Sequence, residues 1–176
     1  MAYLVAGLMR LCTIALPWWV SLPVDTMALY GIFYFLFDRY VWKWSMLHRL
    51  GIVRVPDISG KWHGKVIPAG GTAATGRLTV EKDIEVTIAQ TWTQIRIRGA
   101  TDSSRFQSIS ANLLVEDERS LSYEYVNEPS VDAVATMHVH RGITRLKIDT
   151  VAGTLEGDYF SGRDRQGIGI LTLRST

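Results

Sequence analysis

Tyrosines at every second position mark two segments whose side chains could bind a flat ligand. Side chains alternate between the faces of a strand, so Tyr123, Tyr125 and Asn127 share one face of the first segment. Tyr159 lies in the second segment, two residues after Gly157, which leaves space beside it. A tyrosine ring stacks on a planar ligand while its hydroxyl donates a hydrogen bond. These residues predict a ligand-binding cavity, and ordinary packing in a protein interior is the alternative.

Three arginines near the ends of these segments are candidates for binding the charged part of a ligand. Arg163 and Arg165 follow Tyr159 in a predicted turn, and Arg141 lies in another turn. Guanidinium groups bind phosphate through parallel, charge-assisted hydrogen bonds. A small anionic ligand is therefore a candidate partner, and solvated loop charge is the alternative interpretation.

The sequence contains no pattern typical of an enzyme. His138 and His140 have a spacing found in metal-binding strands, but only two other histidines occur, and neither is close in the sequence. Gly70 and Gly71 lack the Lys-Ser/Thr pair of a phosphate-binding loop. We therefore expect no catalytic activity, no metal site and no cofactor.

The segment that carries these candidates, residues 57–176, consists of about eight short alternating runs. The runs are 58–67, 78–90, 92–99, 105–115, 120–127, 133–140 with a continuation to 148, 154–161 and 167–174. Turn-forming residues separate them. This pattern predicts an all-β, antiparallel up-and-down barrel, which leaves no sheet edge exposed. A two-sheet sandwich is the alternative.

The first and last runs resemble the terminal strands of calycin barrels, the lipocalins and their relatives. Gly60 and Trp62 form a G-x-W pattern in the first run, and Arg174 ends the last run. In calycins the tryptophan closes one barrel end and a C-terminal basic residue packs across it, a favourable cation–π arrangement. The resemblance implies that Gly60, Trp62 and Arg174 close the barrel and do not contact ligand.

Residues 1–56 are predicted to lie in a membrane. Residues 2–22 carry one charge and would span ~31 Å as a helix, close to the ~30 Å of a hydrocarbon core. This run lacks the basic start and small-residue end of a signal peptide. Residues 21–26 form a predicted turn, with Thr26 as the N-cap of a second helix over 27–47.

We therefore expect three parts: a transmembrane helical hairpin in residues 1–50, a short linker in 51–56 and a barrel in 57–176. A pair of buried helices in a soluble domain is the alternative for the first part. Basic residues follow the second helix, which places both termini and the barrel in the cytoplasm. These basic residues are Arg39, Lys43, Arg49 and Arg54. The expected aromatic belt on that side consists of Tyr40, Trp42 and Trp44.

Arg10 and Asp38 each lie 12 residues from the predicted turn, at the same depth in an antiparallel hairpin. Charges inside a membrane are costly and usually pair. We predict an Arg10–Asp38 pair, within one hairpin or between neighbouring copies. The alternative is that the second helix leaves the membrane early, with Asp38 among the headgroups.

The charge distribution argues against nucleic-acid binding by the barrel. Residues 1–56 hold five basic and two acidic residues, whereas residues 57–176 hold 14 basic and 15 acidic ones. Binding to DNA or RNA requires a broad basic surface. The single cysteine, Cys12, excludes a disulfide framework within the chain.

Taken together, the two membrane helices, the segment PDISGKWHGKV and the closing segments LEGDYFSGR and GILTLR resemble a known family. The chain is similar to the SMODS-associated two-transmembrane β-barrel effectors of bacterial CBASS anti-phage systems. The resemblance implies a receptor whose barrel binds a cyclic dinucleotide made by a partner nucleotidyltransferase. It further implies that ligand binding promotes homo-oligomerisation, inner-membrane disruption and death of the infected cell.

The main alternative is a membrane-tethered, lipocalin-like carrier of a lipid or another hydrophobic small molecule. A purely aliphatic barrel interior would favour that carrier. Inward-facing tyrosines and arginines would favour a nucleotide receptor.

Replacement of Asp38 by asparagine tests the predicted pair. D38N is expected to impair membrane insertion or oligomerisation, because it removes the only predicted partner of the Arg10 charge. Membrane fractionation and chemical cross-linking of the full chain measure both effects, with D25N in the predicted turn as the matched control. Unchanged insertion, oligomerisation and cell killing in D38N would contradict the pairing.

Overall fold

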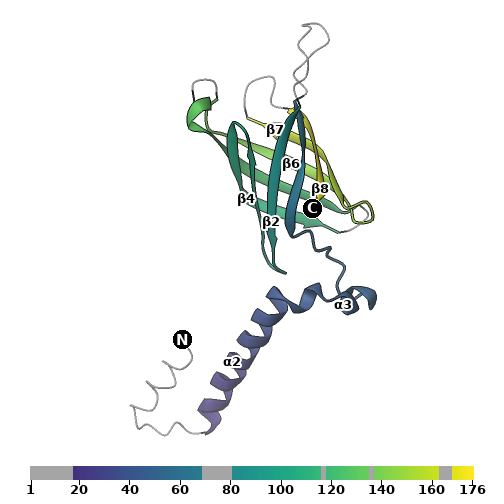
Figure 1. Cartoon of the computed structure of the whole chain (residues 1–176). Coiled ribbons are helices and arrows are strands. Elements are labelled where there is room, and N and C mark those ends of the chain that lie inside the picture. Colours follow the sequence, from purple (N-terminus) through teal and green to yellow (C-terminus); the bar gives the residue numbers. More distant parts are fainter. Residues whose placement is uncertain (1–17, 69–80, 116–117, 135–136, 163–167) are drawn as a thin grey trace, which may run out of the picture. The chain divides into compact units, whose positions relative to one another are not determined.

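The computed structural model of the chain describes residues 18–68, 81–115, 118–134, 137–162 and 168–176 (Figure 1). The chain divides into two compact units, residues 1–41 and 42–176, and each is described by itself. The segment 42–56, which the sequence analysis divided between hairpin and linker, is grouped with the barrel.

The first unit contains helix α2 (Trp18–Arg39). The predicted turn over 21–26 with Thr26 as N-cap is wrong, because the helix runs through these residues without a break. Pro23 lies in the second turn of α2, where its missing N–H removes a single helical hydrogen bond. The large apolar side chains between Met27 and Leu36 are exposed.

Helix α2 also ends earlier than predicted. It stops at Arg39, and the chain continues through the 3-10 helix η1 (Val41–Lys43) and the short helix α3 (Ser45–Arg49). The predicted bounds of the second helix, 27–47, are therefore wrong. Within the described part of the chain, no helix has both the length and the apolar character that crossing a membrane requires. Arg10 lies outside the described residues, so its pairing with Asp38 stays a prediction.

The second unit is an eight-stranded barrel closed by pairing of its first and last strands (Figure 1). Every strand pairs antiparallel with the next in sequence order, which confirms the predicted up-and-down barrel and excludes the sandwich. The strands are β1 (Gly60–Pro68), β2 (Lys82–Gln90), β3 (Ile95–Thr101), β4 (Ser104–Leu114), β5 (Ser120–Pro129), β6 (His140–Asp149), β7 (Thr154–Ser161) and β8 (Ile168–Ser175).

Two predicted strands began too early. The run that starts at residue 133 begins on the last residue of the 3-10 helix η2 (Val131–Ala133), residues 137–139 are not in a strand, and β6 starts only at His140. The run that starts at Trp92 begins with a turn, in which the Thr91 amide donates to the Gln94 carbonyl at 2.8 Å. In both places, apolar residues beside a turn continue the alternating pattern of the strand, so the pattern predicts a strand start that is too early.

The barrel interior differs between its two ends. We call the end where β1 begins and β8 finishes the linker end, and the opposite end the far end. Toward the linker end the interior is filled by Trp62 and aliphatic side chains. These buried aliphatic residues include Ile88, Ile97, Leu121, Leu146, Leu155 and Leu173. Tyrosines and the buried polar residues Asn127 and Thr144 lie toward the far end.

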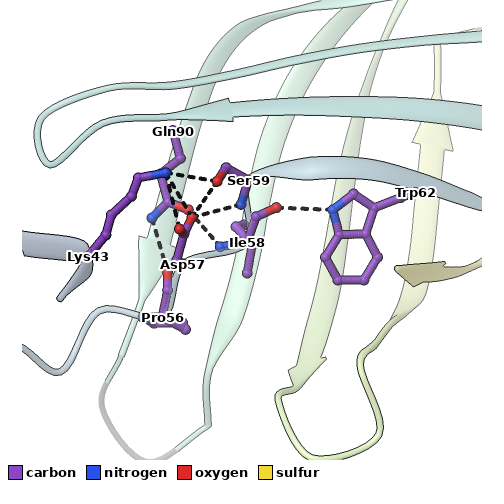
Figure 2. Close-up of polar contacts among 7 residues, drawn as sticks. All are labelled: Lys43, Pro56, Asp57, Ile58, Ser59, Trp62 and Gln90. Atoms are coloured by element: carbon purple, nitrogen blue, oxygen red, sulfur yellow. Dashed lines mark hydrogen bonds and ion pairs between the residues drawn. The ribbon is translucent and has the colours of Figure 1, made fainter. Parts of the chain in front are cut away.

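Trp62 lies on β1, faces the barrel interior and is 6% exposed. Its indole N–H donates to the Ile58 carbonyl at 3.0 Å (Figure 2). Gly60 has a φ of 134°, a conformation that residues with a side chain rarely adopt. Arg174 does not pack across Trp62 as we expected. It is exposed on the outer wall, because it falls on the opposite face of β8 from the buried Leu171 and Leu173.

The segment before β1 is held at the linker end by the buried side chain of Gln90 (Figure 2). The Ile58 amide donates to Gln90 Oε1 at 2.8 Å, and Gln90 Nε2 donates to the Pro56 carbonyl at 3.0 Å. One side chain therefore satisfies a donor and an acceptor of a buried, non-repetitive backbone segment.

Substitution of Gln90 by leucine is expected to destabilise the barrel by about 2–4 kcal/mol, because two buried backbone groups lose their partners. Chemical denaturation of the full chain in detergent measures the free energy of unfolding. Gln107→Leu, at an exposed position of β4, is the matched control and should change it by less than about 0.5 kcal/mol. Equal losses in the two variants would show that Gln90 does not hold the segment.

Candidate functional site

Three aromatic rings form a cluster inside the barrel toward the far end. The centroids of Phe106 and Tyr123 are 6.3 Å apart with nearly parallel rings, and Phe106 meets Tyr125 edge-on at 5.6 Å. Tyr123 and Tyr125, two residues apart on β5, have centroids 6.1 Å apart. The cluster gives this part of the interior a planar, polarisable surface that carries two hydroxyl groups.

Glycines on neighbouring strands make room for the tyrosines. A side chain at Gly142 of β6 would clash with the Tyr125 hydroxyl, and one at Gly169 of β8 would clash with the Tyr159 ring. Tyr159 is itself only partly buried. The rings of Tyr125 and Tyr159 therefore lie where the neighbouring strands carry no side chain.

The tyrosine hydroxyls are held in their neutral, hydrogen-donating form. Burial raises the pKa of Tyr123 to about 12, against a smaller lowering by its hydrogen bond with Thr144. Burial also raises the pKa of Tyr125, with a further contribution from the neighbouring Tyr123 and Tyr159 hydroxyls, and it raises the pKa of Tyr159. The site can donate neutral hydrogen bonds but supplies no base at physiological pH.

Asn127 extends this polar surface along β5. It is 7% exposed, and its Nδ2 donates to the thioether sulfur of Met137 at 3.5 Å. The structure thus brings together Tyr123, Tyr125, Asn127 and Tyr159 on the inner wall, at the positions that strand alternation predicted.

The arginines are not brought to the same place. Arg141 is the second residue of β6, and it is exposed on the outer wall because the next residue, Gly142, faces inward. Arg163 and Arg165 lie outside the described residues, so their role stays a prediction. His138 precedes β6 and is not on a strand, so His138 and His140 do not share a strand face.

The outer wall of β2, β3, β4 and β5 has a depression that was not predicted from the sequence. It encloses about 440 Å³, and two of its lining residues are Arg98 and Arg105. Ala100 pairs with Arg105 and Arg98 pairs with Gln107, so the two arginines are diagonal neighbours on adjacent strands. Glu85 and Glu128 line the same depression, which makes its charge mixed. The alternation of Arg96 and Arg98 was the available signal for an outward, basic strand face.

The barrel and the N-terminal segment each match a family model. Residues 53–175 match the model described as the Cap15 cyclic dinucleotide receptor domain, which covers more than half of the chain. The chain belongs to the Cap15 family. Residues 1–43 match the model of the Cap15 TM helices, so the N-terminal segment is the membrane-anchoring part. Both matches confirm the resemblance to CBASS effectors.

Three curated relatives carry the name CD-NTase-associated protein 15. The chain is 30% identical to the protein from Yersinia aleksiciae over 149 residues, which cover 83% of this chain and 67% of the relative. It is 24% identical to the protein from Staphylococcus schleiferi, with 89% of this chain and 81% of the relative covered. It is also 24% identical to the protein from Escherichia albertii, with coverages of 82% and 71%. The Cap15 assignment therefore extends over both parts of the chain.

Alkaline titration tests the burial of the tyrosines. Their folded pKa values exceed the value of about 10 in an unfolded chain, so the contribution of the tyrosines to stability is constant below pH ~10 and falls as the pH rises toward 12. We expect tyrosinate absorbance and loss of barrel structure to rise together in this range.

Tyr123→Phe should make the alkaline loss of stability shallower, and Tyr40→Phe, which removes the hydroxyl of an exposed tyrosine outside the barrel, should leave it unchanged. Full tyrosine ionisation below pH 11 with an intact barrel would contradict the buried placement.

Proposed function

We propose that the far half of the barrel binds a cyclic dinucleotide from a partner nucleotidyltransferase, and that binding drives homo-oligomerisation and disruption of the bacterial inner membrane. The proposed topology places both termini and the barrel in the cytoplasm. In this proposal the protein is a receptor and effector of antiviral defence without catalytic activity of its own. The main support for this proposal is that Tyr125, Asn127 and Tyr159 all face the barrel interior. The half of the interior nearer the linker end is filled with aliphatic side chains.

Base recognition is assigned to the tyrosines and Asn127. Stacking of a base on an aromatic ring contributes about 1–3 kcal/mol and tolerates any base. Tyr159, partly exposed and backed by Gly169, offers a ring face of this kind. The Asn127 amide donates to a thioether sulfur, a weak acceptor, so an oxygen or nitrogen of a base edge would be a better partner.

Phosphate recognition is assigned to two arginines that follow β7 in the sequence. Arg163 and Arg165 directly follow the strand that carries Tyr159. Two guanidinium groups match the two phosphates of a cyclic dinucleotide in number and charge. The near-neutral composition of residues 57–176 suits a receptor that must not bind bulk nucleic acid.

The interior chemistry disfavours the lipid-carrier alternative. A carrier of hydrophobic molecules needs an apolar interior, but three tyrosines, Asn127 and Thr144 occupy the far half. The linker half is apolar, yet Trp62 and buried aliphatic side chains fill it.

In this proposal, ligand binding shifts the protein from the free state to the assembled state, and the assembled state damages the membrane. A ligand changes that equilibrium only if it binds the assembled state more tightly. The exposed apolar side chains of α2, such as Met27, Tyr30 and Phe33, are surfaces that neighbouring copies or lipid can cover.

Substitution of Tyr159 by leucine tests the binding site. Y159L should weaken binding about 5- to 150-fold through the loss of one stacking contact. Isothermal titration of the full chain in detergent with cyclic di-AMP, cyclic di-GMP, cyclic GMP–AMP and cyclic di-UMP measures this change. Phe160→Leu is the matched control, because Phe160 is the next residue of β7 and is exposed on the outer wall. Dye release from vesicles on ligand addition should fall in Y159L and persist in F160L.

Two outcomes would overturn the proposal. Absence of binding to every dinucleotide in the set removes the receptor function as stated. Loss of binding in the double variant R98Q/R105Q, with Y159L unaffected, would move the ligand to the outer-wall depression and contradict the interior site.

A further inference from the structure

The chain that leaves the membrane segment folds back onto the barrel unit at once. Trp42 is fully buried and packs against Trp92 in the turn between β2 and β3, with ring centroids 6.1 Å apart. Trp42 is therefore not part of an exposed aromatic belt, which corrects the sequence analysis. Since residues 1–43 match the membrane helices of the family, the fold of the barrel unit begins where the membrane segment ends.

Lys43 forms an ion pair and a hydrogen bond with residues of the barrel unit (Figure 2). Its Nζ lies 2.8 Å from Ser59 Oγ, 3.1 Å from Asp57 Oδ2 and 5.3 Å from the centroid of the Trp42 ring. Burial acts to raise the pKa of Asp57, but hydrogen bonds from Ser59 and Lys43 outweigh it, so the pKa lies below its usual value. Asp57 is therefore ionised at neutral pH and neutralises Lys43.

The segment that follows, residues 44–54, is folded but apolar on its surface. The Leu47 carbonyl accepts hydrogen bonds from the amides of Ile52 and Val53, and Val53 is 2% exposed. Four large apolar side chains of this segment are more than half exposed, which is unusual for a water-facing surface. They are Trp44, Met46, Leu50 and Ile52.

The same segment carries cations without acidic residues. Arg49 and Arg54 are exposed, and the sequence WSMLHRLGIVR contains no aspartate or glutamate. Among the described residues, neither arginine forms an ion pair, in contrast to Lys43. Residues 44–54 therefore combine exposed apolar groups with uncompensated positive charge.

We infer that residues 44–54 form a lipid-binding surface of the barrel unit that recognises anionic headgroups. Anionic bilayers attract juxtamembrane arginines, and apolar side chains beside them insert at the headgroup boundary. Residue 44 directly follows the matched membrane helices in the sequence, so this segment is juxtamembrane. In a symmetric contact through this same segment, a second copy would bring no acidic group opposite Arg49 and Arg54, because residues 44–54 contain none.

This surface has a role beyond anchoring. Two contacts flank the segment: Lys43 binds Asp57 and Ser59, and the Pro56 carbonyl accepts a hydrogen bond from Gln90. Both ends of residues 44–54 are therefore fixed to the linker end of the barrel, and lipid contact would restrain the barrel itself. The inference shares with the proposed function the placement of the barrel beside the membrane, but it does not depend on dinucleotide binding.

Site-directed fluorescence on the full chain tests the inference. Leu50→Cys in a C12S background is labelled with an environment-sensitive fluorophore and reconstituted in phosphatidylcholine vesicles, with or without phosphatidylglycerol. Lipids bearing a nitroxide near the headgroup should quench the label far more in vesicles that contain phosphatidylglycerol. Val139→Cys, an exposed site at the far end of the barrel, is the matched control and should stay unquenched.

Adding R49Q and R54Q should raise several-fold the phosphatidylglycerol fraction needed for half-maximal quenching, because each arginine contributes about 1 kcal/mol near an anionic surface. Equal quenching in both vesicle types, or no effect of the double variant, would overturn the recognition of anionic lipid. A label that is shielded from water but not quenched by lipid would overturn it too, because a protein surface would then cover the segment. The same samples are also titrated with the dinucleotides. Binding of a dinucleotide without the lipid effect would overturn only the lipid-binding surface, and the lipid effect without dinucleotide binding would overturn only the receptor function.

Discussion

Pairing of β1 with β8 is the constraint on which the barrel unit depends. Register along this seam runs from Trp62 opposite Ser175 to Pro68 opposite Gly169, so closure fixes which side chains of both strands face inward. Close approach at the seam leaves no space for a side chain at Gly64, where one would collide with the backbone of β8. Closure also removes exposed sheet edges from a protein whose N-terminal part is already strongly apolar.

The closed barrel separates two tasks along one axis. The linker half uses Trp62 and aliphatic side chains to provide stability, and the far half carries the hydroxyl and amide groups that a polar ligand requires. The tyrosines can be large there only because glycines face them from β6 and β8. Stability and recognition are therefore built from different residues of the same strands.

The sequence predicted the barrel because strand alternation is strong where one face is buried and the other is solvated. Tyr123, Tyr125 and Asn127 fall inward by that rule alone, and Trp62 lies near the start of the first strand as its pattern indicates. Arg141 was placed in a turn, whereas it is the second residue of β6, and alternation with the inward-facing Gly142 puts it on the outer wall. The burial of Trp42 against Trp92 joins residues far apart in the sequence, and no local pattern in either segment indicates that contact.

The hold of Gln90 on Pro56 and Ile58 has a mechanical consequence. A pull on the chain from the N-terminal side meets the contacts of Trp42 and Lys43 first, then the Gln90 side chain, and then the ladders from β1 to β2 and β8. Load directed along the strand is shared by many hydrogen bonds at once and does not open them one by one. A force along the first strand therefore loads its hydrogen bonds to both neighbouring strands in shear.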